Sequence, residues 1–77
     1  MDIKVGQIWS HYKRPSQRYE IIATGKDSDS LEEVVVYKAL YQGEFGFGQV
    51  WCRKKNEFLG KKEVDGKEIN RFILIEE

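Results

Sequence analysis

Turn-forming residues interrupt this chain at short intervals, and the stretches between them are rich in β-branched and aromatic side chains. The only proline lies in the polar stretch 13–17, residues 25–30 are polar and acidic, and three glycines fall within 43–48. Asp65-Gly66 is typical of a type I′ hairpin turn, because both residues tolerate a positive φ. β-branched and aromatic residues suit a pleated, half-buried surface. We therefore expect short strands at 7–12, 18–24, 31–41, 48–53, 62–69 (folded about Asp65-Gly66) and 71–76.

The number of strands limits the possible architectures. A chain of 77 residues has room for one domain with a thin core, which its 2 Trp, 4 Tyr and 4 Phe side chains fill efficiently. Short strands at this spacing are typical of a small barrel or sandwich, and closure into a barrel removes most unpaired edge groups. The sequence therefore predicts an all-β fold, a single barrel domain over residues 1–77 with about five or six antiparallel strands.

Residues 31–41 carry two conflicting patterns. Ser30 followed three residues later by Glu33 is typical of a helix capping box. The valines at 34–36 and Tyr37 are stiff at χ1 and are poor helix formers, so we expect a strand. A single helical turn is expected at 56–60.

Alternation along residues 31–41 separates two kinds of side chain. Tyr37 and Tyr41 share one face of the strand, and Val34, Val36 and Leu40 share the other. The aliphatic face is the better candidate for the core, which leaves the tyrosine face exposed with at least one ring lining a groove. For Tyr37 and Trp51, a place in the core and a place in the groove both stay open.

The charge and the cysteine content exclude several classes of protein. The 13 basic and 13 acidic residues cancel, so global charge does not favour nucleic acid or an acidic membrane surface. The charges are nevertheless uneven, with acidic residues at 27–33 and basic residues at 53–62. Cys52 is the only cysteine, which excludes an internal disulfide and a cysteine-rich zinc site. With no apolar run of about 20 residues and no apolar signal core, we expect no membrane partner and a cytoplasmic location.

A series of short motifs follows in order along nearly the whole chain: His11-Tyr12-Lys13, Tyr19-Glu20, the run 34–41, Trp51-Cys52-Arg53, Phe58 and Arg71-Phe72. In order and spacing they resemble the bacterial domain-of-unknown-function family DUF1653. The resemblance implies an SH3-like β-barrel and implies no activity, because the family has no established one. The chain departs from the family pattern at 27–30, where a His-Ser-Glu-Thr type run is usual. It also departs in its longer, more aromatic loop 42–49 and at Lys54, where proline is usual.

The candidate ligand-binding residues combine aromatic rings with side chains that bind anions. They are His11, Tyr12, Tyr37, Trp51 and Arg53. Arginine offers a planar fork suited to carboxylate or phosphate, and aromatic rings beside basic residues suit single-stranded nucleic acid. The alternative for His11 is a strand residue with a structural hydrogen bond.

Other residues have simpler interpretations. Cys52 should face away from Trp51 and Arg53 and behave as a small buried hydrophobe. Lys54 and Lys55 are expected to pair with the acidic stretch. Two further expectations concern residues outside the groove. They are a Glu20–Arg71 ion pair, and a loop tip where Phe45 and Phe47 either contact a partner or lie under the barrel mouth.

These patterns favour a small non-catalytic binding module over an enzyme. Its groove would take a peptide, a partner protein or a small acidic ligand, and the alternative is a nucleic-acid-binding barrel. No acid–base pair, Gly-x-Ser-x-Gly elbow or set of three or four metal ligands is visible, so we expect no catalytic residues, no metal and no cofactor.

Overall fold

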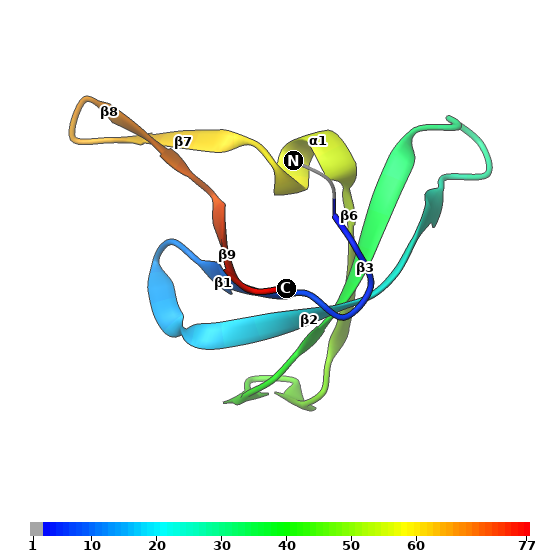
Figure 1. The fold of residues 1–77 in the computed structure, drawn as a ribbon, viewed down its shortest axis with the longest axis horizontal. Coiled ribbons are helices and arrows are strands. Elements are labelled where there is room, and N and C mark those ends of the chain that lie inside the picture. The colour runs from blue at the N-terminus through cyan, green and yellow to red at the C-terminus, as the bar shows by residue number, and fades with distance from the viewer. Residues whose placement is uncertain (1–2) are drawn as a thin grey trace.

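A five-stranded antiparallel sheet is the centre of the computed structural model, which describes residues 3–77 (Figure 1). Its strand order is β6-β3-β2-β1-β9. The strands are β1 (Ile8–His11), β2 (Arg14–Lys26), β3 (Glu33–Ala39), β6 (Val50–Lys54) and β9 (Phe72–Glu76). Two small antiparallel sheets pair β4 (Gln42–Gly43) with β5 (Gly46–Phe47), and β7 (Lys61–Val64) with β8 (Lys67–Asn70). The one helix in this part of the chain, α1 (Lys55–Phe58), has four residues, and no helix there is long and apolar enough to cross a membrane.

The all-β fold with five antiparallel strands in the main sheet is confirmed. Residues 33–39 form a strand, as the three valines predicted, and the helical turn begins one residue before the expected range. The hairpin turn is also confirmed, since Asp65 and Gly66 have φ of 52° and 78°. The long strand β2 pairs with β1 through its first part and with β3 through its second, and the register with β3 shifts between Ile21 and Ala23.

The sheet does not close into a barrel, because β6 and β9 are its two edges and do not pair. In Figure 1 the chain runs from β6 through α1 and the β7–β8 hairpin before it reaches β9. Side chains and one loop contact bridge the two edges instead. The N–H of Arg71, just before β9, donates to the carbonyl of Gly60, just after α1, at 3.0 Å. The Phe58 and Phe72 rings stack at 4.1 Å between centres with 6° between planes.

The core lies on the face of β3 that carries Val35, Tyr37 and Ala39, all of them buried. The prediction that Val34, Val36 and Leu40 form the core face is therefore wrong. Val34 and Val36 share their face with Lys38, whose ammonium lies 3.8 Å from the carboxylate of Glu20, and these side chains are only half-buried. In the described part of the chain, five aromatic rings and four aliphatic side chains, among them the completely buried Ile21 and Val35, together fill the interior of this small fold.

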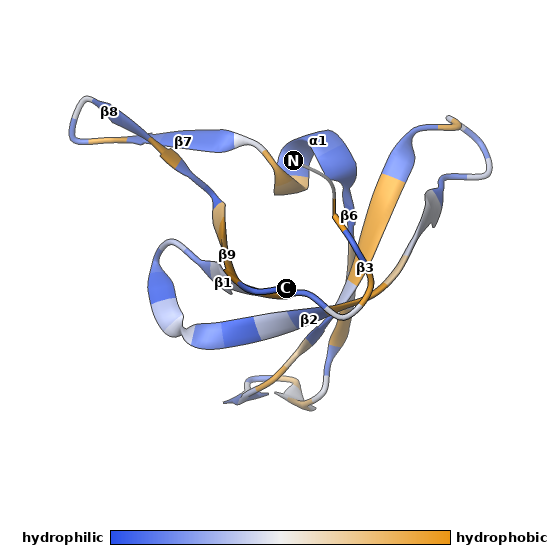
Figure 2. Cartoon of the chain, in the orientation of Figure 1, coloured by the Kyte–Doolittle hydropathy of each residue, from blue (hydrophilic) through white to orange (hydrophobic). Residues whose placement is uncertain are grey.

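Rings from four strands and α1 meet in that interior. Phe58 is completely buried, and Trp9 and Tyr37 contact it edge-on at 5.2 and 5.3 Å between ring centres. Tyr19 contacts Tyr37 edge-on at 5.4 Å. Figure 2 shows hydrophobic residues on β3 and β9 and mostly hydrophilic residues on the β7–β8 hairpin. The core therefore lies between the main sheet and α1, and the hairpin extends from it.

Candidate functional site

Four positively charged side chains from three stretches of the chain surround His11. We call Lys13, Arg14, Arg53 and Arg71 the cationic cluster. His11 ends β1, Lys13 and Arg14 follow in the turn and at the start of β2, Arg53 is on β6, and Arg71 directly precedes β9. The folding of the sheet brings the β6 edge to the β9 edge, so that His11 and Arg53 both pack against the ring of Phe72.

The surroundings of His11 favour its neutral form. Partial burial lowers the pKa of the imidazole, and the charges of Arg53, Arg71, Lys13 and Arg14 lower that pKa further. Nδ1 of His11 accepts the backbone N–H of Lys13 at 3.1 Å, so in the neutral ring the proton is on Nε2. His11 is therefore a hydrogen-bond donor through Nε2, and it is surrounded by cations rather than paired with a base.

Arg53 is fixed by two aromatic side chains. Its Nε donates to the hydroxyl of Tyr37 at 3.2 Å, and its guanidinium carbon lies 5.7 Å from the centre of the Phe72 ring. Within residues 3–77 the two Nη groups of Arg53 make no hydrogen bond or ion pair. The planar end of this guanidinium is therefore held in place with its terminal donors free.

Arg71 contains the clearest unsatisfied group of the site. Its backbone is fixed, since its N–H donates to Gly60 and its carbonyl accepts the N–H of Tyr12, both at 3.0 Å. Its side-chain Nε is buried and has no hydrogen-bond partner among the described residues. The predicted Glu20–Arg71 ion pair does not form, because Glu20 pairs across the sheet with Lys38. A buried donor without an acceptor costs about 1–3 kcal/mol, which an anionic ligand would recover.

None of the ion pairs within residues 3–77 involves an arginine. The expected pairing of the neighbouring lysines is confirmed: Lys54 lies 3.0 Å from Glu32, and Lys55 lies 3.5 Å from Glu33. The hydrogen bond to Glu32 raises the pKa of Lys54. Glu32 and Glu33 of the acidic stretch thus pair with the two lysines that follow Arg53. They do not form ion pairs with the cationic cluster.

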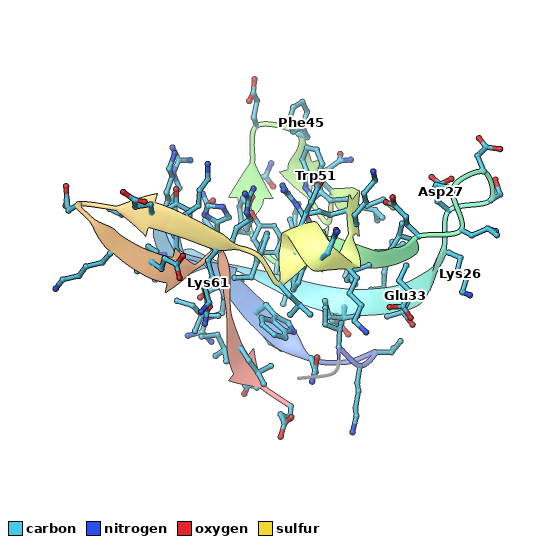
Figure 3. The ribbon with its side chains drawn as sticks, turned by 90° about the horizontal axis from the view of Figure 1, so that it is seen from above. Lys26, Asp27, Glu33, Phe45, Trp51 and Lys61 are labelled. Carbon is cyan, nitrogen blue, oxygen red and sulfur yellow. The ribbon has the colours of Figure 1, made fainter. Side chains whose placement is uncertain are left out.

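Trp51, two residues before Arg53 on β6, forms an exposed aromatic pair with Phe45. Their ring centres are 5.5 Å apart with 74° between the planes, and their exposed fractions are 38% and 64% (Figure 3). In the register of β3 with β6, Trp51 is opposite Tyr37 and Arg53 is opposite Val35. Directly opposed residues of antiparallel strands project from the same face. Trp51 and Arg53 therefore project from the same face of β6 as the buried Tyr37.

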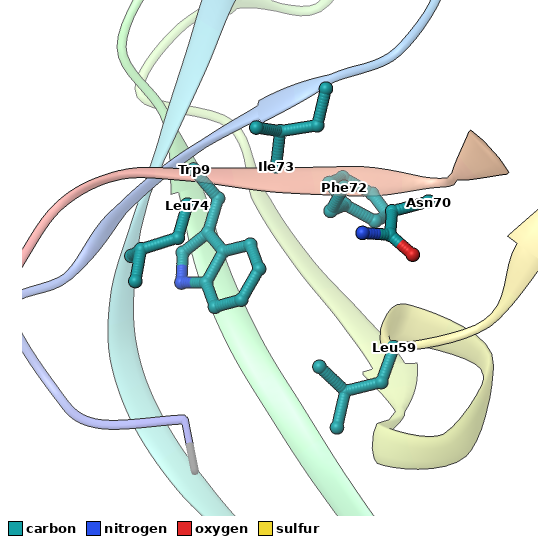
Figure 4. A pocket seen from close by; sticks show the side chains of 6 residues that line it. All are labelled: Trp9, Leu59, Asn70, Phe72, Ile73 and Leu74. Carbon is teal, nitrogen blue, oxygen red and sulfur yellow. The ribbon is translucent and has the colours of Figure 1, made fainter. Parts of the chain in front are cut away.

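Two cavities lie next to this arrangement. A cavity of about 240 Å³ is lined by His11, Lys13, Arg14, Gln17 and Tyr19, so it opens onto the cluster. The hydroxyls of Tyr19 and Tyr41 bond to each other at 2.8 Å, and burial and this bond raise the pKa of Tyr19. A larger cavity of about 420 Å³ is lined by mostly apolar side chains: Trp9, Leu59, Asn70, Phe72, Ile73 and Leu74 (Figure 4). Of these two cavities only the smaller one is lined by cationic side chains, those of Lys13 and Arg14, and neither cavity is lined by Arg53 or Arg71.

The structure brings most of the predicted site residues together. His11, Tyr37 and Arg53 meet around Phe72, Tyr12 packs on His11 at 4.7 Å between ring centres, and Trp51 lies at the side. Tyr37 is a core residue whose hydroxyl reaches the site, and Trp51 is exposed.

Three members of the cluster, Lys13, Arg14 and Arg71, are not among the residues that the sequence predicts for the site, and the burial of one cysteine is predicted wrongly. Lys13 and Arg14 lie in a polar turn around a proline, where charged residues are common and carry no signal of a site. The sequence pattern of Arg71 indicated only an ion pair with Glu20. Cys52 projects from the opposite face of β6, as predicted, but it is exposed rather than buried. The reason is that β6 is an edge strand, so its outer face has few neighbours to cover the thiol.

In the part of the chain that the structure describes, no three His, Cys, Asp or Glu side chains are placed to hold a metal ion. The chain matches the family model described as "Protein of unknown function (DUF1653)" over residues 7–74. No curated protein and no solved structure matches it. The matched range covers four strands of the main sheet, the first part of β9 and all of the cationic cluster, and the chain belongs to the DUF1653 family.

Proposed function

We propose that this protein is a non-catalytic binding module whose cationic cluster takes the anionic group of a ligand. The observation that carries the proposal is the buried Nε of Arg71, which has no acceptor among residues 3–77. The fixed guanidinium of Arg53, whose charge acts on His11 as that of Arg71 does, has free terminal donors. Buried polar groups are nearly always hydrogen-bonded, so an unpaired donor in a group of cations supports an anionic acceptor in the ligand.

The electrostatics support an anionic ligand. Four positive side chains lie around one partly buried imidazole, and their mutual repulsion decreases when an anion enters. Hydrogen bonds between charged partners are about twice as strong as neutral ones. The chain has zero net charge, but two of its acidic residues, Glu32 and Glu33, are paired with Lys54 and Lys55 and not with the cluster. The field near the cluster is therefore positive although the whole molecule is neutral.

The surroundings of His11 favour binding over catalysis. A general base needs a pKa near the working pH and usually a third group that orients it, often a carboxylate. The charges that act most strongly on His11 are all cationic, and its Nδ1 is occupied by a backbone N–H. An exposed free thiol at Cys52 suits a reducing compartment, so the proposal includes a cytoplasmic location.

The proposal is tested by titrating isotope-labelled protein with pyrophosphate and with citrate at low salt, following backbone amide shifts. We expect saturable shifts at residues 11–14, 53 and 71. Arg53→Gln should weaken binding at least tenfold, because it removes a charged donor. The matched control is Lys62→Gln, which removes one exposed positive charge from the β7–β8 hairpin. No saturable shift with either anion, or equal binding by the Arg53→Gln and Lys62→Gln proteins, would contradict the proposal.

A further inference from the structure

Large apolar side chains are exposed on the β4–β5 hairpin and at the start of β6. They are Phe45, Phe47, Val50 and Trp51, of which Trp51 shares a face of β6 with Arg53 and Val50 projects from the other face. Contact of such surface with water is unfavourable, and exposed apolar patches next to polar groups mark binding sites. Trp51 is the member closest in sequence to the cluster, since only Cys52 separates it from Arg53.

The spacing of Trp51 and Arg53 suits one particular kind of ligand. Residues two apart on a strand project from the same face about 6.6–6.8 Å apart. One of these positions offers a ring, and the other offers a guanidinium that the hydroxyl of Tyr37 holds in place. A nucleotide has the complementary arrangement, because one sugar separates a flat base from a charged phosphate. Bases stack on aromatic side chains, and basic groups bind the backbone, in proteins that take single strands.

The donors of the cluster favour phosphate over carboxylate. Together with His11 they come from three stretches of the chain, at 11–14, 53 and 71, so they are not confined to one strand. They include guanidinium groups and the Nε2–H of neutral His11. A carboxylate has two oxygens in one plane, whereas a phosphate monoester presents three acceptor oxygens in three dimensions and more charge.

We infer that the site takes a nucleotide unit, with its phosphate at the cationic cluster and its base against Trp51 and Phe45. This inference rests on the proposed function and specifies its ligand. The unit is a free mononucleotide or a residue of a single-stranded nucleic acid. Both sources present the same phosphate and base to the site, and the length of the probe distinguishes them.

The test uses tryptophan fluorescence, because the two tryptophans differ in their surroundings. Trp51 is exposed, and Trp9 is buried in the core. The probes are inorganic phosphate, uridine monophosphate, eight-residue oligo(U) and oligo(dT), and an eight-residue peptide rich in glutamate. We expect the nucleotide probes to quench Trp51 fluorescence and to bind at least tenfold more tightly than inorganic phosphate. Quenching should disappear in Trp51→Phe, while the affinity stays within about threefold because a ring remains.

Removal of the ring gives the decisive comparison. Trp51→Ala should weaken binding of the nucleotide probes by roughly 5- to 100-fold and leave inorganic phosphate binding unchanged. The matched control is Val64→Ala, an equally exposed apolar residue on β7 with the same 38% exposed fraction. Thermal unfolding of each variant checks that the fold is intact. A gain in affinity from monophosphate to oligonucleotide, with steep salt dependence, identifies a single strand. Equal affinity for both identifies a free nucleotide.

The outcomes separate the two proposals. If inorganic phosphate binds and Arg53→Gln abolishes this binding, but nucleotides bind no more tightly and leave Trp51 unquenched, the nucleotide inference is wrong and the proposed function stands. Tighter binding of the acidic peptide than of the oligonucleotides overturns the inference in favour of a peptide ligand. If no probe binds at low salt, both proposals fall.

Discussion

The protonation of His11 affects both the stability of the fold and the charge of the cationic cluster. Partial burial and four neighbouring cations lower the pKa of its ring, and the N–H of Lys13 occupies Nδ1, where a second proton would have to bind. Protonation would therefore add a fifth positive charge and break a hydrogen bond of the β1–β2 turn. The folded state keeps this ring neutral at pH values at which the unfolded chain already binds a proton.

The first prediction follows from that difference. The pKa of His11 is lowered in the folded state from its ordinary value of 6.5, so the unfolded state binds the proton first. The free energy of unfolding should decrease as the pH falls from about 6.5 towards the folded-state pKa, and level off below it. Urea unfolding at several pH values between 5 and 7.5 measures this decrease.

The control for the first prediction is His11→Asn. The amide oxygen of asparagine accepts the N–H of Lys13 from nearly the position of Nδ1, but asparagine does not titrate. The pH dependence in this window should be flatter for the variant than for the natural chain. Parallel profiles for the two proteins would show that His11 does not cause the decrease.

The second prediction concerns the hydroxyl that holds Arg53. Tyr37→Phe keeps the ring contacts with Tyr19, Phe58 and Phe72 and removes only the oxygen that accepts from Arg53 Nε. We expect a loss of about 0.5–1.5 kcal/mol in the free energy of unfolding, typical of one hydrogen bond. Pyrophosphate should bind more weakly, because the guanidinium is less well positioned. Urea unfolding and the amide-shift titration measure the two effects.

Tyr12→Phe is the matched control, because the Tyr12 hydroxyl makes no hydrogen bond within residues 3–77. It should unfold like the natural chain and bind pyrophosphate with the same affinity. If Tyr37→Phe also bound with unchanged affinity, Tyr37 would be a core residue only, without a positioning role for Arg53.

Among the elements, β3 shows best how far sequence alone can predict this fold. Its β-branched residues predicted a strand correctly, and alternation correctly separated Tyr37 from Val34 and Val36. The prediction that the valine face points inward was wrong, because it rested on valine being more hydrophobic than tyrosine. Lys38 shares the face of the valines, and this charged residue was the available signal for an outward face. Ring packing with Phe58 and Phe72 comes from distant segments, and no local pattern contains it.

The same limit explains which site residues could be predicted. Arg53 and Trp51 were recognisable from their places in a strand, because alternation is a local property. Arg14 and Arg71 join the cluster only after β1, β2 and β9 have paired, and that pairing brings together residues more than 50 positions apart in sequence. The chemical type of each residue is known directly from the sequence. Which residues lie close together in space depends on the register of the whole sheet.

The β7–β8 hairpin carries the third prediction. Gly66 has a φ of 78°, and a Cβ added there meets no atom within 4 Å. Gly66→Ala should therefore be penalised only by backbone strain, at about 1–2 kcal/mol. Gly25→Ala in β2 is the matched control, since its surroundings are equally open and its φ is not in the left-handed region. It should be neutral, or stabilising by up to about 1 kcal/mol.

Hydrogen exchange of residues 61–70 measures this third prediction, because the strain acts within the hairpin. Faster exchange there in Gly66→Ala, with unchanged exchange in β2 and β3, is the expected result. Equal effects of the two alanine substitutions on the free energy of unfolding would show that the positive φ is not the cause.

At the scale of the whole molecule, an open sheet is stabilised without backbone closure. The sequence predicted a closed barrel because closure satisfies the edge groups. In the observed structure β6 and β9 do not pair with each other, and Phe58, Phe72 and the guanidinium of Arg53 join these two edges instead. Side-chain packing between two edges depends on the position of α1, which a sequence pattern of four residues does not specify. The site lies at this junction, so the residues that bridge the edges also position the cluster.

The fourth prediction tests whether the Phe58–Phe72 stack joins the two edges into one cooperative unit. Leucine at either position keeps most of the apolar volume and removes the stacking, so each single substitution should cost less than about 1.5 kcal/mol. In a double-mutant cycle, Phe58→Leu and Phe72→Leu should couple by about 0.5–1.5 kcal/mol. The control cycle combines Phe58→Leu with Phe45→Leu, because the Phe45 ring contacts only Trp51 among the aromatic rings described. Those two substitutions should be additive.

Urea unfolding followed by circular dichroism measures both cycles. Hydrogen exchange adds a second readout: if the stack holds the edges together, Phe72→Leu on β9 should accelerate exchange in β6 as well. Additive energies in the first cycle, with faster exchange confined to β9, would mean that α1 and the sheet edges are stabilised independently.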